Sequence, residues 1–408
     1  MDEIKNKNFK KVVFGVIAVV VIIVIAVCFV IAFNNTKATD NKDNTTVTNN
    51  TSNSNTKTNT NTNSNTNLSS SSNSSINKTD SKNLNITASG SYDLTGEYES
   101  VTVNTSGEVI LNLNGVEITN TTGPAINIEK AKKVTIVLAG TNKVTAETTE
   151  DLDGAIYSKA DLVFEGNGSL EVKSNYDGIV SKDTLVIKNG TYNVTADDDG
   201  IRGKDSVEIS GGDFTINAGG DGIKSSNDED TSLGYVTITG GTFNITAKSD
   251  GIQGITKATI SGGTFNINSS EGIEATYVKI DDGTINIEAS DDGINASKKS
   301  NIGTPTVEIN GGNITIKMGQ GDTDGVDSNG NIVINGGTIN VTGQSAFDYD
   351  GTGTINGGTV ICNGEQVTTL PNQMMGGPQG GGMPGQMNQN GEMPNGGRQR
   401  MNGGQGIR

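Results

Sequence analysis

The sequence predicts an all-β protein built as a right-handed parallel β-helix, a solenoid in which each coil contributes three short strands. A phrase of an acidic residue, a glycine and an aliphatic residue recurs between residues 177 and 326, with a basic step of about 21 to 22 residues. A fixed period of this size is typical of solenoids. Each period also holds two runs that alternate apolar and polar residues around a glycine pair, and no run of ten residues has a helical period.

Alignment of the periods places equivalent residues in columns, and two of these columns are apolar. We expect them to form the core, because no coil can bury its apolar face alone. From residue 84 to 370 we count about eleven coils, which at about 4.8 Å between strands gives a rod on the order of 50 Å long. The first column contains Tyr192, Phe214, Phe243, Phe265, Ile285, Ile314, Ile339 and Val360, and the second contains Val194, Ile216, Ile245, Ile267, Ile287, Ile316 and Val341.

The chain before the repeats predicts a membrane anchor. Residues 12–33 form an uncharged apolar run long enough to span a bilayer, and the lysines among residues 1–11 favour a cytoplasmic N-terminus. A cleaved signal peptide is the alternative, but its apolar core would be about 7 to 15 residues long. We therefore expect a single-pass protein of the cell membrane, with the β-helix outside the cell.

Two segments around the repeats have the composition of disordered chain. Asn, Thr and Ser make up 38 of the 50 residues in 34–83, which predicts a flexible linker. Residues 371–408 are rich in Gly, Met and Pro and predict a disordered tail. The tail's methionines leave Cu(I) binding as a remote alternative.

The composition excludes several kinds of chemistry. The chain has no His, which removes the usual general base near pH 7, the commonest zinc ligand and a Ser/His triad. It has no Trp, and its net charge is −17. Cys28 and Cys362 fall in very different surroundings, so no structural disulfide is expected.

The acidic phrase predicts a metal site. Its first position is a carboxylate in every repeat, whereas the glycine-pair corner accepts any small polar residue. Stacked carboxylates about 5 Å apart repel each other by roughly 3 kcal/mol per pair at an effective dielectric constant of 20. A cation bound between coils would turn this unfavourable interaction energy into a favourable one. Oxygen ligands without His or Cys favour Ca²⁺, and a solvated acidic edge is the alternative. The candidate ligands are Asp177, Asp198, Asp199, Asp221, Asp228, Asp230, Asp250, Glu271, Asp292 and Asp324.

Two stretches resemble a known family. The block from Asp221 to Tyr235 with the strand that follows it, and the ending from Ala346 to Asp350 with its later Asn-Gly-Gly, are similar to the bacterial carbohydrate-binding β-helix proteins of a cellulolytic clostridium. The resemblance covers residues 84–370. It implies a pectate-lyase-like right-handed β-helix, calcium held by acidic residues, and binding of cellulose or acidic plant polysaccharide.

We favour the first of three functions and keep the other two as alternatives. The first is a carbohydrate-binding protein without catalysis, for which the lack of Trp favours a pectin-like acidic ligand bridged by calcium over cellulose. The second is a pectate-type lyase, in which Arg202 or Lys224 would remove a proton. The third is a structural surface rod or adhesin. We expect a monomer without nucleic-acid partners, and we assign ligand binding to Arg202, Lys224 and Tyr235.

Overall fold

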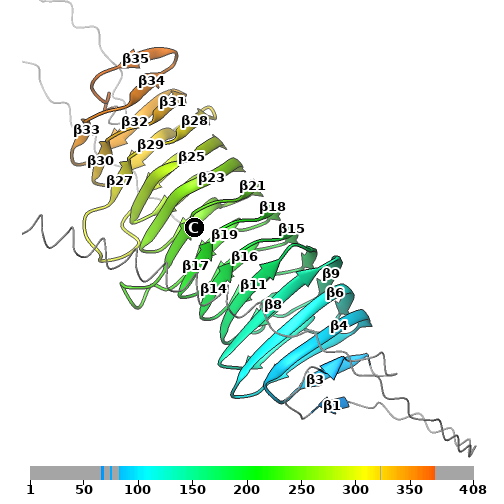
Figure 1. Ribbon diagram of the computed structural model, residues 1–408. Helices are drawn as coiled ribbons and strands as arrows, with labels where there is room; N and C mark the ends of the chain where they lie inside the picture. Colours follow the sequence, from blue (N-terminus) through cyan, green and yellow to red (C-terminus); the bar gives the residue numbers. More distant parts are fainter. Residues whose placement is uncertain (1–65, 69–73, 76–81, 322, 373–408) are drawn as a thin grey trace, which may run out of the picture. The chain divides into compact units, whose positions relative to one another are not determined.

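The computed structural model describes residues 66–68, 74–75, 82–321 and 323–372. Every regular element in these ranges is a β-strand, and successive coils stack so that equivalent strands pair in parallel (Figure 1). The strands form three ladders, which confirms the all-β parallel solenoid with three strands per coil. No helix among the described residues is long and apolar enough to cross a bilayer, and the predicted anchor at residues 12–33 lies outside them.

The first ladder is a 13-stranded parallel sheet. Twelve of its strands follow residue 82 (13 less β1), one more than the predicted eleven coils. Its first strand lies within the range predicted as a linker. The strands are β1 (Thr66–Leu68), β3 (Asn83–Ile86), β5 (Ser100–Asn104), β7 (Ile126–Lys130), β10 (Gly154–Ser158), β13 (Asp177–Ser181), β16 (Ile201–Gly203), β19 (Ile223–Ser225), β22 (Asp250–Gly254), β24 (Glu271–Ala275), β26 (Asp292–Ala296), β29 (Asp324–Ser328) and β32 (Ser345–Tyr349).

The second and third ladders together form a 22-stranded sheet, because four long strands run through both. The second ladder contains β2 (Ser74–Ser75), β4 (Gly90–Tyr98), β6 (Glu108–Asn120), β8 (Lys133–Ala139), β11 (Asp161–Gly166), β14 (Thr184–Ile187), β17 (Ser206–Ile209), β20 (Tyr235–Ile238), β23 (Lys257–Ser269), β25 (Tyr277–Ala289), β27 (Thr306–Ile309), β30 (Asn331–Ile334) and β33 (Gly353–Ile355). The third contains the second halves of β4, β6, β23 and β25, with β9 (Thr141–Ala146), β12 (Ser169–Ser174), β15 (Thr191–Ala196), β18 (Asp213–Ala218), β21 (Thr242–Ala247), β28 (Asn313–Met318), β31 (Thr338–Thr342), β34 (Thr359–Cys362) and β35 (Glu365–Val367).

The two predicted apolar columns are confirmed residue by residue. Parallel pairing joins each member to its counterpart on the next coil of the third ladder, from Tyr192 to Val360 and from Val194 to Val341. All of these side chains are buried. Cys362 continues the second column beyond Val341 and is half-buried. The strands alternate buried and exposed residues because successive side chains point to opposite faces of a sheet.

Two kinds of glycine allow the coils to stack closely. At the corner between the second and third ladders, Gly241 has φ of +117°, a conformation that glycine adopts without penalty. In the acidic phrase, a Cβ atom on Gly178 would lie 2.6 Å from the carbonyl oxygen of Gly200 on the next coil. A larger residue at Gly178 would therefore push the coils apart.

The C-terminal end of the stack is covered by the chain itself. β35 pairs antiparallel with β34, which ends the third ladder as a hairpin. The chain then returns to the first ladder, where the Tyr349 hydroxyl donates to the Leu370 carbonyl at 3.3 Å and Leu370 is buried. These contacts shield the edge that the last coil would otherwise expose.

Candidate metal and ligand site

The acidic residues of the repeat lie at the start of the strands of the first ladder or two residues before it. Asp250 pairs with Glu271 and Asp292 with Asp324, so the predicted column exists. Burial separates it into two parts. Asp177, Asp199, Asp221 and Asp250 are at most 4% exposed, whereas Glu271, Asp292 and Asp324 are half-buried.

Backbone hydrogen bonds give this column a structural role in addition to its charge. The amide N–H of Asp199 donates to Oδ1 of Asp177 at 3.0 Å, and the N–H of Asp221 donates to Oδ1 of Asp199 at 2.9 Å. The same bond joins Asp250 to Asp221 at 2.9 Å and Asp324 to Asp292 at 3.1 Å. Four carboxylates of the column, those of Asp177, Asp199, Asp221 and Asp292, thus satisfy a backbone donor of the next coil, a role that was not predicted from the sequence.

A second column lies three residues further along each coil and decides how the carboxylates are neutralised. Parallel pairing connects its members from β13 to β32 of the first ladder. In order, they are Val180, Arg202, Lys224, Gln253, Glu274, Asn295, Asp327 and Asp348. Two of the early members are cations, and the later ones are amides and carboxylates.

Arg202 and Lys224 act as internal counter-ions of the early carboxylates. Nη2 of Arg202 lies 2.5 Å from Oδ2 of Asp177 and also bonds to Asp153. Nζ of Lys224 lies 2.7 Å from Oδ2 of Asp221 and 3.3 Å from Oδ2 of Asp199. Burial alone would lower the pKa of Lys224, but the two carboxylates outweigh it and raise that pKa. Both predicted ligand-binding cations are therefore already paired.

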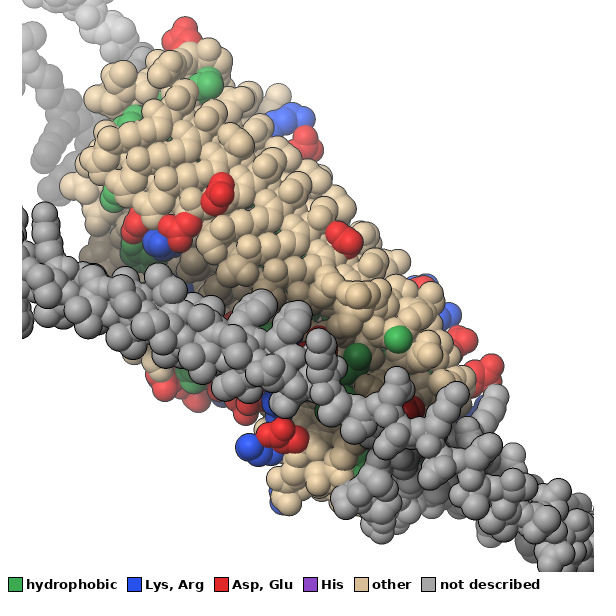
Figure 2. Space-filling view, in the orientation of Figure 1, with side chains coloured by type: hydrophobic (Ala, Val, Ile, Leu, Met, Phe, Trp, Pro, Cys, Tyr) green, Lys and Arg blue, Asp and Glu red, His purple; other side chains and the backbone are tan. Residues whose placement is uncertain are grey.

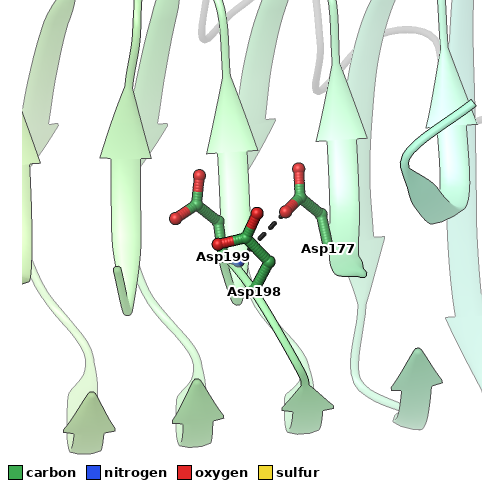
Figure 3. A group of neighbouring side chains, drawn as sticks. All are labelled: Asp177, Asp198 and Asp199. Carbon is green, nitrogen blue, oxygen red and sulfur yellow. Dashed lines mark hydrogen bonds between the residues drawn. The ribbon is translucent and has the colours of Figure 1, made fainter. Parts of the chain in front are cut away.

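Figure 3 shows the first of three groups of carboxylates that come together among the described residues. Asp177 and Asp199 lie on neighbouring coils and Asp198 reaches the same point from the preceding turn, with the hydrogen bond from Asp199 to Asp177 drawn as a dashed line. Burial raises the pKa of Asp177 to about 7, although Arg202 opposes the rise. Arg202 and Lys224 already neutralise the negative charge of this group, so it is the weakest candidate for a metal site among the three groups.

The second group, here called the acidic cluster, consists of Asp250, Glu271 and Glu274. One carboxylate oxygen from each lies within 4.8 Å of the other two. The Gln253 amide donates to Asp250 and, at 3.3 Å, to Glu274. Lys299 forms an ion pair with Glu274, and no other ion pair involves the three carboxylates within the described ranges.

Asn295 extends the acidic cluster with an oxygen that lacks a donor. Its Nδ2 donates to Glu271 at 3.1 Å and to Asp292 at 3.2 Å, so the side chain lies among the carboxylates. The residue is 8% exposed, and its Oδ1 is buried without a hydrogen-bond partner in the structure. A buried unsatisfied carbonyl oxygen is costly, and a cation would satisfy it.

Burial and neighbouring negative charges raise two pKa values in the acidic cluster. Burial, and then the neighbouring charges of Asp221 and Glu274, raise the pKa of Asp250 to about 8. Burial and Glu274 raise the pKa of Glu271 to about 7. Carboxylates crowded in this way either hold protons at neutral pH or share a cation. The third group, Asp324, Asp327 and Asp348, continues the same surface.

Other predicted site residues lie elsewhere. The structure does not bring Asp228 and Asp230 into any of the three groups, because they belong to the connection between β19 and β20, where Oδ1 of Asp230 accepts from the Ser232 N–H at 2.8 Å. Tyr235 begins β20 on the second ladder, and its hydroxyl donates to Glu208 at 2.8 Å. The predicted ligand-binding set of Arg202, Lys224 and Tyr235 is thus divided between two sheets.

Sequence reasoning missed Gln253, Glu274 and Asn295. The signal was present, because all three hold the repeat position of Arg202 and Lys224. Their residue types vary from coil to coil, so no single residue type marks this repeat position in the sequence.

The fold and the site together define a β-solenoid protein with a carboxylate-lined sheet. The chain belongs to the family described as carbohydrate-binding domain-containing protein, whose model matches residues 80–322 and 268–366. A protein of the same description from Acetivibrio thermocellus is 37% identical over 119 residues, which cover 26% of this chain and 42% of that relative. The match spans about two-fifths of the relative's length.

A solved structure is also similar. It is a gadolinium derivative of the polysaccharide lyase-like protein from C. thermocellum, 27% identical, with a TM-score of 0.36 over 69% of this chain and 89% of that one.

Proposed function

We propose that this protein is a membrane-anchored, extracellular carbohydrate-binding protein that uses a right-handed β-helix and bound Ca²⁺ to hold an acidic, pectin-like polysaccharide. Membership of the carbohydrate-binding family supports the ligand class. The anchor is the apolar run at residues 12–33. Cellulose is the alternative ligand, and the absence of Trp speaks against it.

The acidic cluster with Asn295 is the observation that carries the calcium part of this proposal. Asp250, Glu271 and Glu274 supply carboxylate oxygens, and the unsatisfied Oδ1 of Asn295 supplies a carbonyl oxygen. These hard oxygen donors fit Ca²⁺. The ion would neutralise the cluster and offer a positive charge to sugar carboxylates.

Calorimetric titration of the full chain in detergent micelles with polygalacturonate, with Ca²⁺ and with EDTA, tests the proposal. We expect EDTA, or the double substitution Glu271→Gln with Glu274→Gln, to weaken binding at least about tenfold, which corresponds to about 1.4 kcal/mol. Glu129→Gln is the matched control, because Glu129 lies exposed on the same ladder outside the cluster. Binding of equal strength in EDTA would refute the role of calcium.

The lyase alternative needs an uncharged base beside the substrate. Arg202 and Lys224 are poor candidates because their ion pairs with buried aspartates raise both pKa values against the effect of burial. We therefore propose binding without cleavage. Absorbance of unsaturated product during the titration would overturn this view, and absence of binding to any polysaccharide would favour the structural rod.

A further inference from the structure

A column of two tyrosines and one lysine crosses three successive coils of the second ladder. Tyr235 pairs with Lys257, and Lys257 pairs with Tyr277. All three side chains face away from the core, since the next residue along each strand is buried. We call Tyr235, Lys257 and Tyr277 the tyrosine–lysine column.

Carboxylates on the flanking coils fix both aromatic rings. The Tyr235 hydroxyl donates to Glu208 on the preceding coil, and the Tyr277 hydroxyl donates to Glu308 on the following coil. Glu308 is itself held by the Nδ2 of Asn310 at 2.8 Å. Because the two hydroxyls bond in opposite directions, the rings are held at either end of the column, with Lys257 between them.

Lys257 lacks the partner that neighbouring lysines have. It is exposed and forms no ion pair within the part of the chain that the structure describes. On the same face, Lys279 pairs with Asp281 at 2.7 Å and Lys188 pairs with Glu165 at 2.8 Å. An unpaired cation between two tyrosine rings, in a chain of net charge −17, offers an anionic group both a charge and an aromatic surface.

The two longest corners of this part of the stack flank the column. The connections at residues 226–234 and 297–305 lead into the coils of Tyr235 and Thr306, and Figure 1 shows them projecting from the same side of the stack. Both are anchored to the coils between them. The Thr256 hydroxyl donates to the Leu233 carbonyl at 2.6 Å, and Thr276 accepts from the Ser300 N–H at 2.9 Å.

We propose that the tyrosine–lysine column is a calcium-independent subsite for a carboxylated sugar, a uronate unit of the chain that the protein holds. The inference rests on the proposed acidic ligand. The sugar carboxylate pairs with Lys257, and the apolar faces of the sugar pack against the tyrosine rings. Two strand spacings separate the tyrosines, about 10 Å, which leaves room for a sugar unit above the lysine.

The test is titration of the full chain in detergent micelles with a short oligogalacturonate in EDTA, so that calcium bridging plays no part. Lys257→Gln is expected to lower the affinity about tenfold or more, and Tyr277→Ala is expected to do the same. Tyr277→Phe keeps the ring and should retain most of the affinity. Lys159→Gln is the control, because Lys159 is another exposed lysine without an ion pair among the described residues.

Two outcomes would overturn the subsite. If Lys257→Gln and Lys159→Gln bind the oligogalacturonate with equal affinity, Lys257 has no role in binding. If a neutral glucan of the same length binds as well as the oligogalacturonate, the subsite does not recognise the sugar carboxylate. Failure of the calcium proposal is distinguishable. If EDTA and the variants of the acidic cluster have no effect while Lys257→Gln weakens binding, the subsite stands without the calcium site.

Discussion

Asp177 and Asp250 hold the same position of the repeat, but the residues around them give the two carboxylates different chemistry. Asp177 contacts Arg202 at 2.5 Å, whereas Asp250 contacts the neutral amide of Gln253 and faces Glu274. Both are buried and both accept or donate along the same ladder of backbone bonds. The same acidic position therefore serves as half of an ion pair in the early coils and as part of the acidic cluster, our proposed calcium site, in the later ones.

The acidic cluster predicts how stability depends on pH. The folded-state pKa values of Asp250, about 8, and Glu271, about 7, lie above the ordinary values of 3.8 and 4.5. Their contribution to stability is therefore present below about pH 4 and is lost as pH rises through 7 to 8. In EDTA we expect the melting temperature to fall between pH 5 and pH 9, and Asp250→Asn with Glu271→Gln to flatten that fall. Circular dichroism at 218 nm measures both.

Calcium should reverse this dependence, because it binds the ionised carboxylates that high pH produces. The gain in melting temperature on adding Ca²⁺ is thus expected to be larger at pH 8 than at pH 5. A gain that is the same at both pH values, or a double variant that falls as steeply as the wild type, would contradict the assignment. Asp93→Asn, at an exposed position of β4, is the control.

The ion pairs of Arg202 lead to a prediction about the stability of the folded protein. Removal of Arg202 leaves the buried Asp177 without a counter-ion, whereas Asp153 keeps its ion pair with Lys182 at 3.0 Å. Removing one partner of a buried ion pair typically costs about 3–5 kcal/mol. We expect Arg202→Ala to lower the free energy of unfolding by that amount, measured by urea denaturation. Adding Asp177→Asn should recover part of the loss, because it removes the stranded charge. A double variant less stable than Arg202→Ala would show that the hydrogen-bond ladder outweighs the charge.

Among the elements, the third ladder contains a stack of four aromatic rings on successive coils. Ring centroids are 4.9 Å apart between Tyr192 and Phe214, 4.7 Å between Phe214 and Phe243, and 4.6 Å between Phe243 and Phe265. The planes of each pair are within 7° of parallel. Such contacts add about 0.5–1.5 kcal/mol per pair beyond the burial of area.

Phe243 lies inside this stack, so we expect its truncation to lower the free energy of unfolding strongly. Phe243→Ala removes two ring contacts and leaves a cavity, so we expect it to destabilise the protein by about 3–5 kcal/mol. Phe243→Leu should cost less, because it fills more of the space. Thr242→Ala changes an exposed neighbour on the same strand and should stay within about 0.5 kcal/mol. Similar losses for Phe243→Ala and Thr242→Ala in urea denaturation would disprove the importance of the stack.

The ladders also explain which parts of the structure the sequence could predict. The apolar columns repeat the same kind of residue on every coil, so the period alone places Phe243 beside Phe265. The column of Arg202, Gln253 and Asn295 changes from cations to amides and carboxylates along the stack, and the role of each member depends on contacts between coils. Hydrogen bonds such as that from Asp221 to Asp199 depend on backbone geometry, which residue types alone do not reveal.

At the scale of the whole stack, a solenoid is a series of coils in which each coil contacts its neighbours, so its ends determine whether it stays monomeric. β35 covers the end of the third ladder, and Leu370 and the Asn372 amide, which donates to the Tyr349 carbonyl at 2.9 Å, cover the end of the first. Without them, β32 and β34 would offer unpaired backbone groups to another molecule.

This cover predicts that monomeric behaviour depends on residues 363–372. A chain ending after Cys362 should expose both strand edges and the buried surface beneath Leu370, and we expect it to self-associate and to melt several degrees lower. A chain ending after Asn372 keeps every one of these contacts and is the matched control. Light scattering coupled to size-exclusion chromatography compares the two. If the shorter chain stays monomeric at the same concentration, the edges are protected by the twist and side chains of the last coil, and the hairpin contributes stability alone.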